Sequence, residues 1–99
     1  MSYDYRALDD VIHSRVRLAI MSYLATARDA DFVQLKKALS VTDGNLSTHL
    51  SKLEEKSYIS VNKQFVDRKP QTRVAITQIG DAAFKAYVGD LAAMLGKQN

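Results

Sequence analysis

Apolar residues recur every three or four positions between Leu8 and Ala27, where Ile12, Val16, Ile20 and Leu24 share one side. This spacing is that of an amphipathic α-helix packed against a core. The polar run at residues 28–31 ends the pattern. The sequence therefore predicts a first helix over residues 8–27.

Two shorter helical patterns follow, over residues 33–39 and 42–56. Leu35 and Leu39 share a face of the former, and only Ser40 and Val41 separate it from Thr42, whose hydroxyl is suited to cap a helix N-terminus. Two short helices joined by so tight a connection are typical of a helix-turn-helix.

The second of these helices has two contrasting faces. At about 100° per residue, Leu46, Leu50 and Leu53 form one narrow apolar seam. The side chains that point away from it are mostly short and polar: Gly44, Thr48, Ser51 and Glu55 lie nearly opposite, with Asn45 and Lys52 beside them. Short side chains let a helix approach a DNA groove, and Asn can pair with the adenine edge, yet an ordinary solvated helix fits this stretch equally well.

Alternating apolar residues at 58–65 and 73–77 predict two β-strands, and the polar run at 66–72, with the chain's one proline, predicts a loose basic tip between them. A tiny strand at Phe32 could complete the sheet. Thr77 is suited to cap a last helix over residues 78–95. The order of elements predicts one mainly α (α+β) domain over residues 1–99: a winged helix-turn-helix with three helices, a hairpin wing (58–77) and a C-terminal dimerisation helix.

Composition narrows the function. The 99 residues contain no Cys, no histidine-based triad and no Gly-rich phosphate loop, so we expect no enzyme and no cofactor. No apolar run approaches a membrane span and no signal peptide is evident, which favours a cytoplasmic protein, associated with the nucleoid when bound to DNA.

Positive charge is concentrated in one segment. The net charge is +3, from 14 basic and 11 acidic residues, and residues 57–77 alone carry +3. The basic residues there are Lys63, Arg68, Lys69 and Arg73. Lys and Arg often protect exposed strand edges, but their position beside a candidate reading helix favours contact with phosphates.

Residues 32–39 and 41–54, followed by Tyr58-Ile59, resemble small winged-helix transcriptional regulators close to the MarR and ArsR groups. The pattern Leu-Ser-x-His-Leu-x-x-Leu at 46–53 is the most specific part, and Thr77-x-x-Gly80 is a weaker match. Two positions depart from the family. Ser57 stands where Gly usually follows the recognition helix, and Val33 stands where a polar cap usually opens the preceding helix.

The resemblance implies a homodimer on double-stranded DNA, with residues 42–56 in the major groove and the wing on flanking backbone or minor groove. The expected DNA-binding residues are Thr42, Asn45, Ser47, Thr48, Ser51, Lys52, Arg68, Lys69 and Arg73, with His49 at the edge. The apolar stripe of the last helix and the first helix would pair the copies through Leu8, Val11, Phe84, Val88, Leu91 and Leu95. Packing of that stripe within its own domain is the alternative.

These observations predict a sequence-specific regulator, more often a repressor, on a pseudo-palindromic site; its effector is unknown. A winged-helix protein-interaction module is the alternative, but that would favour apolar residues on the exposed helix face and no basic wing. The family includes metal sensors. Asp9, Asp10 and His13 lie close in sequence, but acidic residues in a first helical turn are common without metal, and we expect none.

Overall fold

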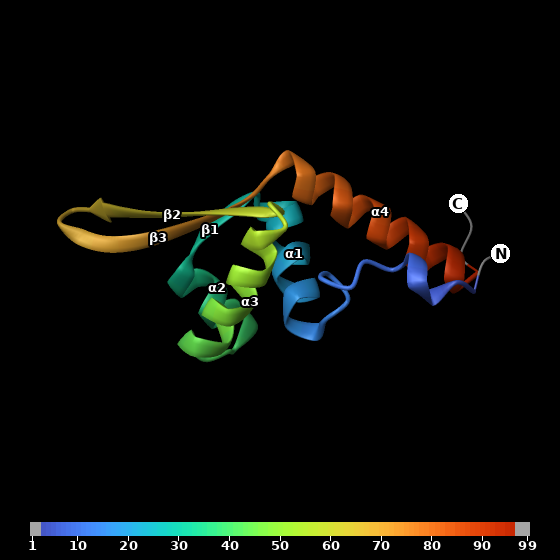
Figure 1. Cartoon of the computed structure of the whole chain (residues 1–99). Helices are drawn as coiled ribbons and strands as arrows, with labels where there is room; N and C mark the ends of the chain where they lie inside the picture. Colours follow the sequence, from blue (N-terminus) through green and yellow to red (C-terminus); the bar gives the residue numbers. More distant parts are fainter. Residues whose placement is uncertain (1–2, 97–99) are drawn as a thin grey trace.

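Four α-helices and three strands, preceded by a short 3-10 helix, make up the part of the chain that the computed structural model describes, residues 3–96. In chain order they are η1 (Tyr5–Ala7), α1 (Arg15–Ala27), β1 (Asp29–Asp31), α2 (Phe32–Leu39), α3 (Asp43–Glu55), β2 (Ile59–Val66), β3 (Lys69–Ile76) and α4 (Gln78–Met94). This is the predicted winged-helix α+β arrangement, with α2 and α3 as the helix-turn-helix (Figure 1).

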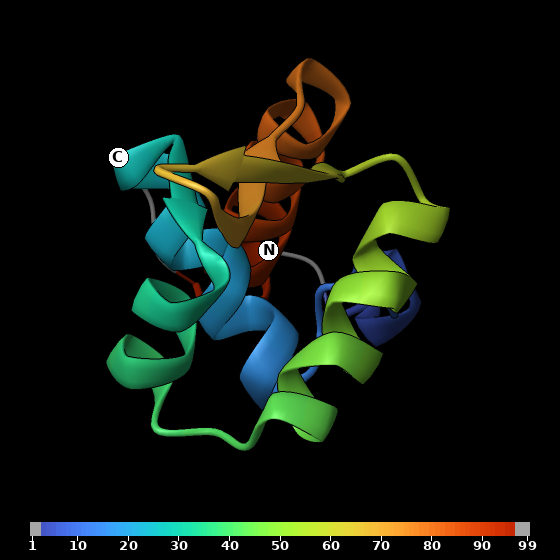
Figure 2. The same cartoon turned by 90° about the vertical axis from the view of Figure 1, so that its left-hand side faces the viewer.

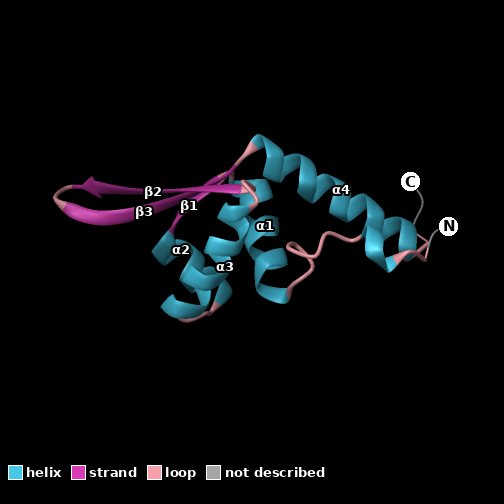
Figure 3. Ribbon diagram, in the orientation of Figure 1, coloured by secondary structure: helices cyan, strands magenta, loops and turns pink. Residues whose placement is uncertain are grey.

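The sheet is antiparallel in the order β1-β3-β2. Val74 of β3 lies opposite Ala30 on one side and Val61 on the other. Because β1 is so short, the outer half of the β2–β3 hairpin continues alone beyond the helices (Figure 3). The strand expected at Phe32 is β1, which ends one residue earlier.

The core lies between α1, α2, α3 and the base of the sheet. The seam of α3 is buried as predicted, with Leu46 and Leu53 fully inaccessible and Leu50 4% exposed. The other buried apolar side chains are Ile12, Ile20, Met21, Leu24, Ala30, Leu35, Ile59, Val74 and Tyr87.

The start of α2 explains why Val33 need not be polar. Asp31 caps the helix two positions before Val33, where the family pattern places the cap: its carboxylate accepts from the Gln34 N–H at 2.7 Å, and the Gln34 side chain accepts from the Asp31 N–H at 2.9 Å. This reciprocal capping box satisfies two backbone donors. Val33 lies within the first turn and is exposed.

The first helix begins at Arg15, so the predicted start at residue 8 was wrong. The Asp9 carboxylate accepts from the backbone N–H groups of Val11 and Ile12, and the backbone is extended at Ser14. Local hydrogen bonds from Asp compete with helix formation in this way. Ile12 still reaches the core, from a turn rather than from a helix.

The hairpin tip is tight, not the loose loop predicted for residues 66–72. Asp67 and Arg68 alone connect the strands, both with positive φ (52° and 66°), as in a type I′ turn. Val66 and Lys69 pair directly after the turn, so the next pair, Phe65 and Pro70, lies at a non-hydrogen-bonded position. The missing N–H of Pro70 is therefore no loss to the hairpin.

Two elements project from the helical body, the hairpin at one end and α4 at the other (Figure 1). Viewed along the hairpin, α2 and α3 lie to either side of α1 (Figure 2). No helix within residues 3–96 is long and apolar enough to cross a membrane.

Candidate DNA-binding surface

Two hydroxyl groups on α3 are partly committed to its own backbone. The Thr42 hydroxyl oxygen accepts from the Asn45 N–H at 3.1 Å, which confirms Thr42 as the N-cap. The Thr48 hydroxyl donates to the carbonyl of Gly44 at 2.9 Å. Thr42 consequently keeps its O–H as a donor for a phosphate, whereas Thr48 can offer a partner only its acceptor lone pairs.

The outward side of α3 is polar and exposed. Asn45 and Lys52 are both exposed. At about 100° per residue they lie on the side of α3 opposite Leu50 and Glu54, which face the wing. Ser47 and Ser51 instead line a hollow between α3 and the wing, together with Lys63 and Thr72. The predicted contacts on this helix thus divide into an outer group and a group that faces the wing.

His49 lies on the third side of α3, against α1. Its Nδ1 is 2.9 Å from the guanidinium of Arg17, which can only donate, so Nδ1 accepts. Burial, then the charges of Arg17 and Lys52, lower the pKa of His49 below its ordinary value. His49 is therefore neutral near pH 7 and serves to hold α3 against α1.

The wing cations have different surroundings. Arg73 is ion-paired with Asp29 across the β1–β3 pair, so the structure engages it within the sheet. Arg68 and Lys69 are exposed at the tip, and no ion pair involves either one within residues 3–96. Lys63 was not among the predicted site residues, yet it lies in the hollow beside α3. Its alternation with Val61 on β2 is the sequence signal that could have placed it there.

The α2–α3 corner is tied by one ion pair. The Lys36 ammonium lies 2.7 Å from the Asp43 carboxylate in the first turn of α3. Both side chains are largely exposed, so the pair adds little stability. It directs Lys36 toward α3.

The candidate dimer surface is divided between two faces of α4. Tyr87 is buried within the domain, whereas the next residue, Val88, is 47% exposed and Leu95 is 65% exposed. Successive helical residues point about 100° apart, so α4 has one face for its own core and another facing outward. The other predicted interface residues, Leu8, Val11, Phe84 and Leu91, are half-buried against their own domain. Leu8 and Val11 precede α1.

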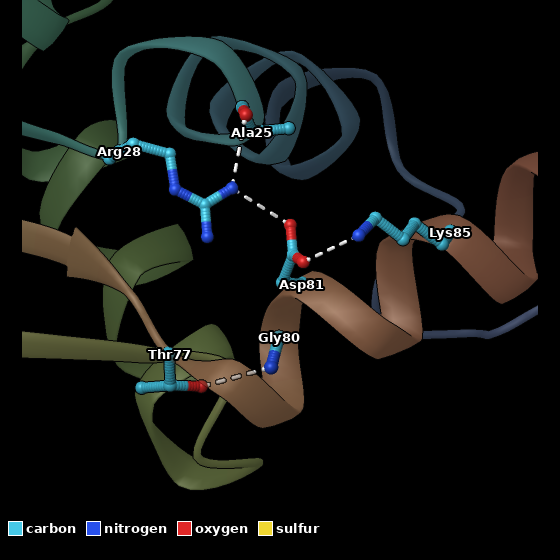
Figure 4. A network of polar contacts seen from close by, with 6 residues as sticks. All are labelled: Ala25, Arg28, Thr77, Gly80, Asp81 and Lys85. Carbon is cyan, nitrogen blue, oxygen red and sulfur yellow. Dashed lines mark hydrogen bonds and ion pairs between the residues drawn. The ribbon is translucent and has the colours of Figure 1, made fainter.

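A polar cluster fixes the first turns of α4 to the end of α1 (Figure 4). Arg28 donates to the Asp81 carboxylate at 2.9 Å and to the carbonyl of Ala25 at 3.2 Å, and Lys85 lies 2.9 Å from the other Asp81 oxygen. Hydrogen bonds from Lys85 and Arg28 lower the pKa of Asp81. Phe84 and Val88 line a hollow beside this cluster.

Asp9 and His13 near the N-terminus are engaged in structural contacts. The second Asp9 oxygen accepts from the Tyr58 hydroxyl, and burial together with this bond raises the pKa of Tyr58 to about 12. The Nδ1 of His13 is 2.7 Å from the Tyr87 hydroxyl. Within residues 3–96 no group of three or more potential metal ligands gathers at one place.

The chain belongs to the family of winged helix DNA-binding domains, whose model matches residues 16–95. The predicted winged-helix resemblance is thereby confirmed.

Three relatives illustrate the likeness. An uncharacterized protein of Methanocaldococcus jannaschii is 36% identical over 81 residues, covering 82% of this chain and 88% of its own. A transcriptional regulator homologue protein from Pyrococcus horikoshii OT3 is also 36% identical, with a TM-score of 0.83 over 87% of this chain and 85% of that one. An ArsR family transcriptional regulator shares the fold at 18% identity, with a TM-score of 0.61 over 90% and 87% of the two chains.

Proposed function

We propose that this protein binds double-stranded DNA sequence-specifically as a homodimer and regulates transcription. The observation that carries the proposal is the division of α3 into a buried apolar seam and an exposed face of mostly short polar side chains. Asn45 would contact a base edge, and Thr42, Ser47, Ser51 and Lys52 would contact bases or phosphates.

The wing would supply affinity that does not depend on sequence. Arg68 and Lys69 are exposed near the tip of the hairpin and can approach DNA phosphates. Binding there would release counterions condensed on the DNA. Arg73 would act mainly through Asp29, by holding the base of the wing. The outward face of α3 carries no apolar anchor, so DNA fits it better than a protein partner does.

Dimerisation would use the exposed face of α4. Val88 and Leu95 form its apolar part, and the hollow lined by Phe84 and Val88 extends it toward α1. A twofold dimer would bind a pseudo-palindrome whose half-sites lie about 10 bp, or a multiple of that, apart. A bound dimer excludes other proteins from its site, so repression is the expected effect. No catalytic step or cofactor is part of this proposal.

Selection from a pool of random DNA duplexes at moderate salt tests the function. We expect enrichment of a two-part, inverted sequence, and affinity for it that falls steeply as salt increases. Recovery of no preferred duplex at any salt concentration would refute sequence-specific binding. Sedimentation of the protein alone would show whether it is a dimer.

A further inference from the structure

Phe65 is the most exposed large apolar side chain in residues 3–96, at 78%. It lies two residues before the hairpin turn, where the strands have left the helical body behind (Figure 1). Removing a phenyl ring from water is favourable, and this ring contributes nothing to the core. Its position therefore suggests a role in contact with another molecule.

The strand alternation gives the direction in which Phe65 faces. Ile59, Val61, Lys63 and Phe65 lie on one face of β2, because alternate residues share a face. Val61 and Lys63 line the hollow against α3. Phe65 thus continues the side of the wing that is turned toward the candidate reading helix, one step farther out, and Val66 lies on the opposite face.

The support under Phe65 is stiff. The two-residue turn at Asp67 and Arg68 keeps the strands paired up to Val66 and Lys69, and Phe65 lies directly opposite Pro70, whose ring restricts its backbone. An aromatic side chain on such a support loses little conformational freedom when it is inserted into a partner.

Three cations border Phe65 along the wing. Lys63 shares its face, and Arg68 and Lys69 follow it around the turn. Asp67 is the one acidic residue between positions 57 and 77, while Glu54 and Asp31 line the hollows beside the wing. An apolar ring bordered by cations is complementary to a groove whose interior is apolar and whose two edges carry anions. The DNA minor groove is such a surface, with sugars and base edges between two rows of phosphates.

We propose that Phe65 inserts into the minor groove next to the major groove occupied by α3, and wedges against a base step there. Apolar side chains used in this way unstack the step and bend the duplex. Pyrimidine–purine steps unstack most readily, so the protein would prefer TA or CA at this flanking position without a hydrogen bond to it. This inference rests on the proposed DNA-binding function.

The test compares F65A with V66A on the duplex selected by the wild-type protein. Val66 is also exposed, at 42%, but faces the other way, so V66A is the matched control. We expect F65A to lose about tenfold in affinity and to lose the TA or CA preference at the flank, and V66A to retain both. 2-Aminopurine placed at that step should brighten when wild type or V66A binds, and stay dim with F65A.

Because neither residue is buried in the core, both variants should retain the wild-type unfolding temperature. If F65A showed the same affinity, step preference and fluorescence change as the wild type, the wedge proposal would be refuted and the proposed function would remain intact. A wild-type protein that selects no duplex would overturn both. A change in the sedimentation of F65A without a change in DNA binding would instead assign the ring to contact between copies of the chain, and would also overturn the wedge.

Discussion

The guanidinium of Arg17 on α1 donates a hydrogen bond to Nδ1 of His49 on α3, over 2.9 Å. The contact requires a neutral imidazole with its proton on Nε2. It joins the helix at the centre of the core to the helix that we propose to enter the major groove. A side chain that resembles a DNA contact in the sequence is thus held by its own domain.

This contact predicts how stability depends on pH. The pKa of His49 is lower in the folded protein than in the unfolded chain, so its stabilising contribution is complete above about pH 6.5 and is lost as the pH falls through the lower, folded value. Urea unfolding of the wild type and His49→Gln between about pH 7.5 and pH 5 would measure it. As the pH falls, the free energy of unfolding should decline less steeply in the variant than in the wild type. Parallel declines would contradict the role assigned to His49.

Gly80 is required by the packing of α4 against Tyr58. A Cβ at Gly80 would lie 2.0 Å from the Tyr58 carbonyl oxygen, whereas one at Gly89, on the same helix, would meet nothing within 4 Å. Gly80→Ala should lower the free energy of unfolding by about 2 kcal/mol or more, since backbone must move. Gly89→Ala should raise it by roughly 0.5 kcal/mol through helix propensity. Thermal unfolding of both variants checks this, and equal effects would refute it.

Ser57 has a left-handed backbone, with φ of 61°. Its N–H bonds to the Glu54 carbonyl and the next N–H to that of Leu53, so the turn closes α3 although the residue is not glycine. Ser57→Gly should stabilise the fold by about 0.5 to 1 kcal/mol, because glycine adopts this conformation without a steric penalty. Ser57→Ala retains the Cβ and should show no such gain in chemical denaturation; a gain of the same size would argue against relief of strain.

Prediction from the sequence succeeded where the spacing of apolar residues alone determines the local structure. The seam of Leu46, Leu50 and Leu53 follows from helical geometry, and it is buried. It failed before residue 15, because the spacing from Ile12 to Val16 is the same whether the chain is helical or turns back at Asp9.

Contacts between distant segments were also beyond the sequence pattern. In the sequence, Arg73 cannot be distinguished from the other wing cations. In the structure, β1 pairs with β3 and places Asp29, 44 positions away, next to Arg73. The turn at Asp67 and Arg68 lacks the usual Asn-Gly signal, so its tight form became evident only from the strand register.

Asn45 and Arg68 should affect DNA binding in different ways. Asn45→Ala should cost about 1 to 3 kcal/mol on the selected site and relax one base position. Arg68→Ala should weaken binding to every duplex and reduce the salt slope by about one. Titrations of selected and scrambled duplexes at several salt concentrations distinguish the two. The same loss on both duplexes for both variants would refute this division of roles.

The outward face of α4 should determine the oligomeric state. The double variant Val88→Asp, Leu95→Asp places charge on the two most exposed apolar residues of the proposed interface and should yield a folded monomer with much weaker operator binding. Ala86→Asp is the control, because Ala86 is exposed on a different side of the helix. Sedimentation of the three proteins checks the expectation. A dimer that persists in the double variant would place the interface elsewhere.

The Thr77 hydroxyl accepts from the Gly80 N–H at 2.9 Å and donates to the Ser57 carbonyl at 2.6 Å, so it clamps the start of α4 to the end of α3. In a dimer that pairs through α4, this clamp would hold the two recognition helices at a fixed separation and orientation. One base pair inserted at the centre of the operator moves the half-sites by about 3.4 Å and turns them by roughly 35°. Two recognition helices held in this way could not follow that rotation of the half-sites. The protein would therefore discriminate the length of its DNA site as sharply as its sequence.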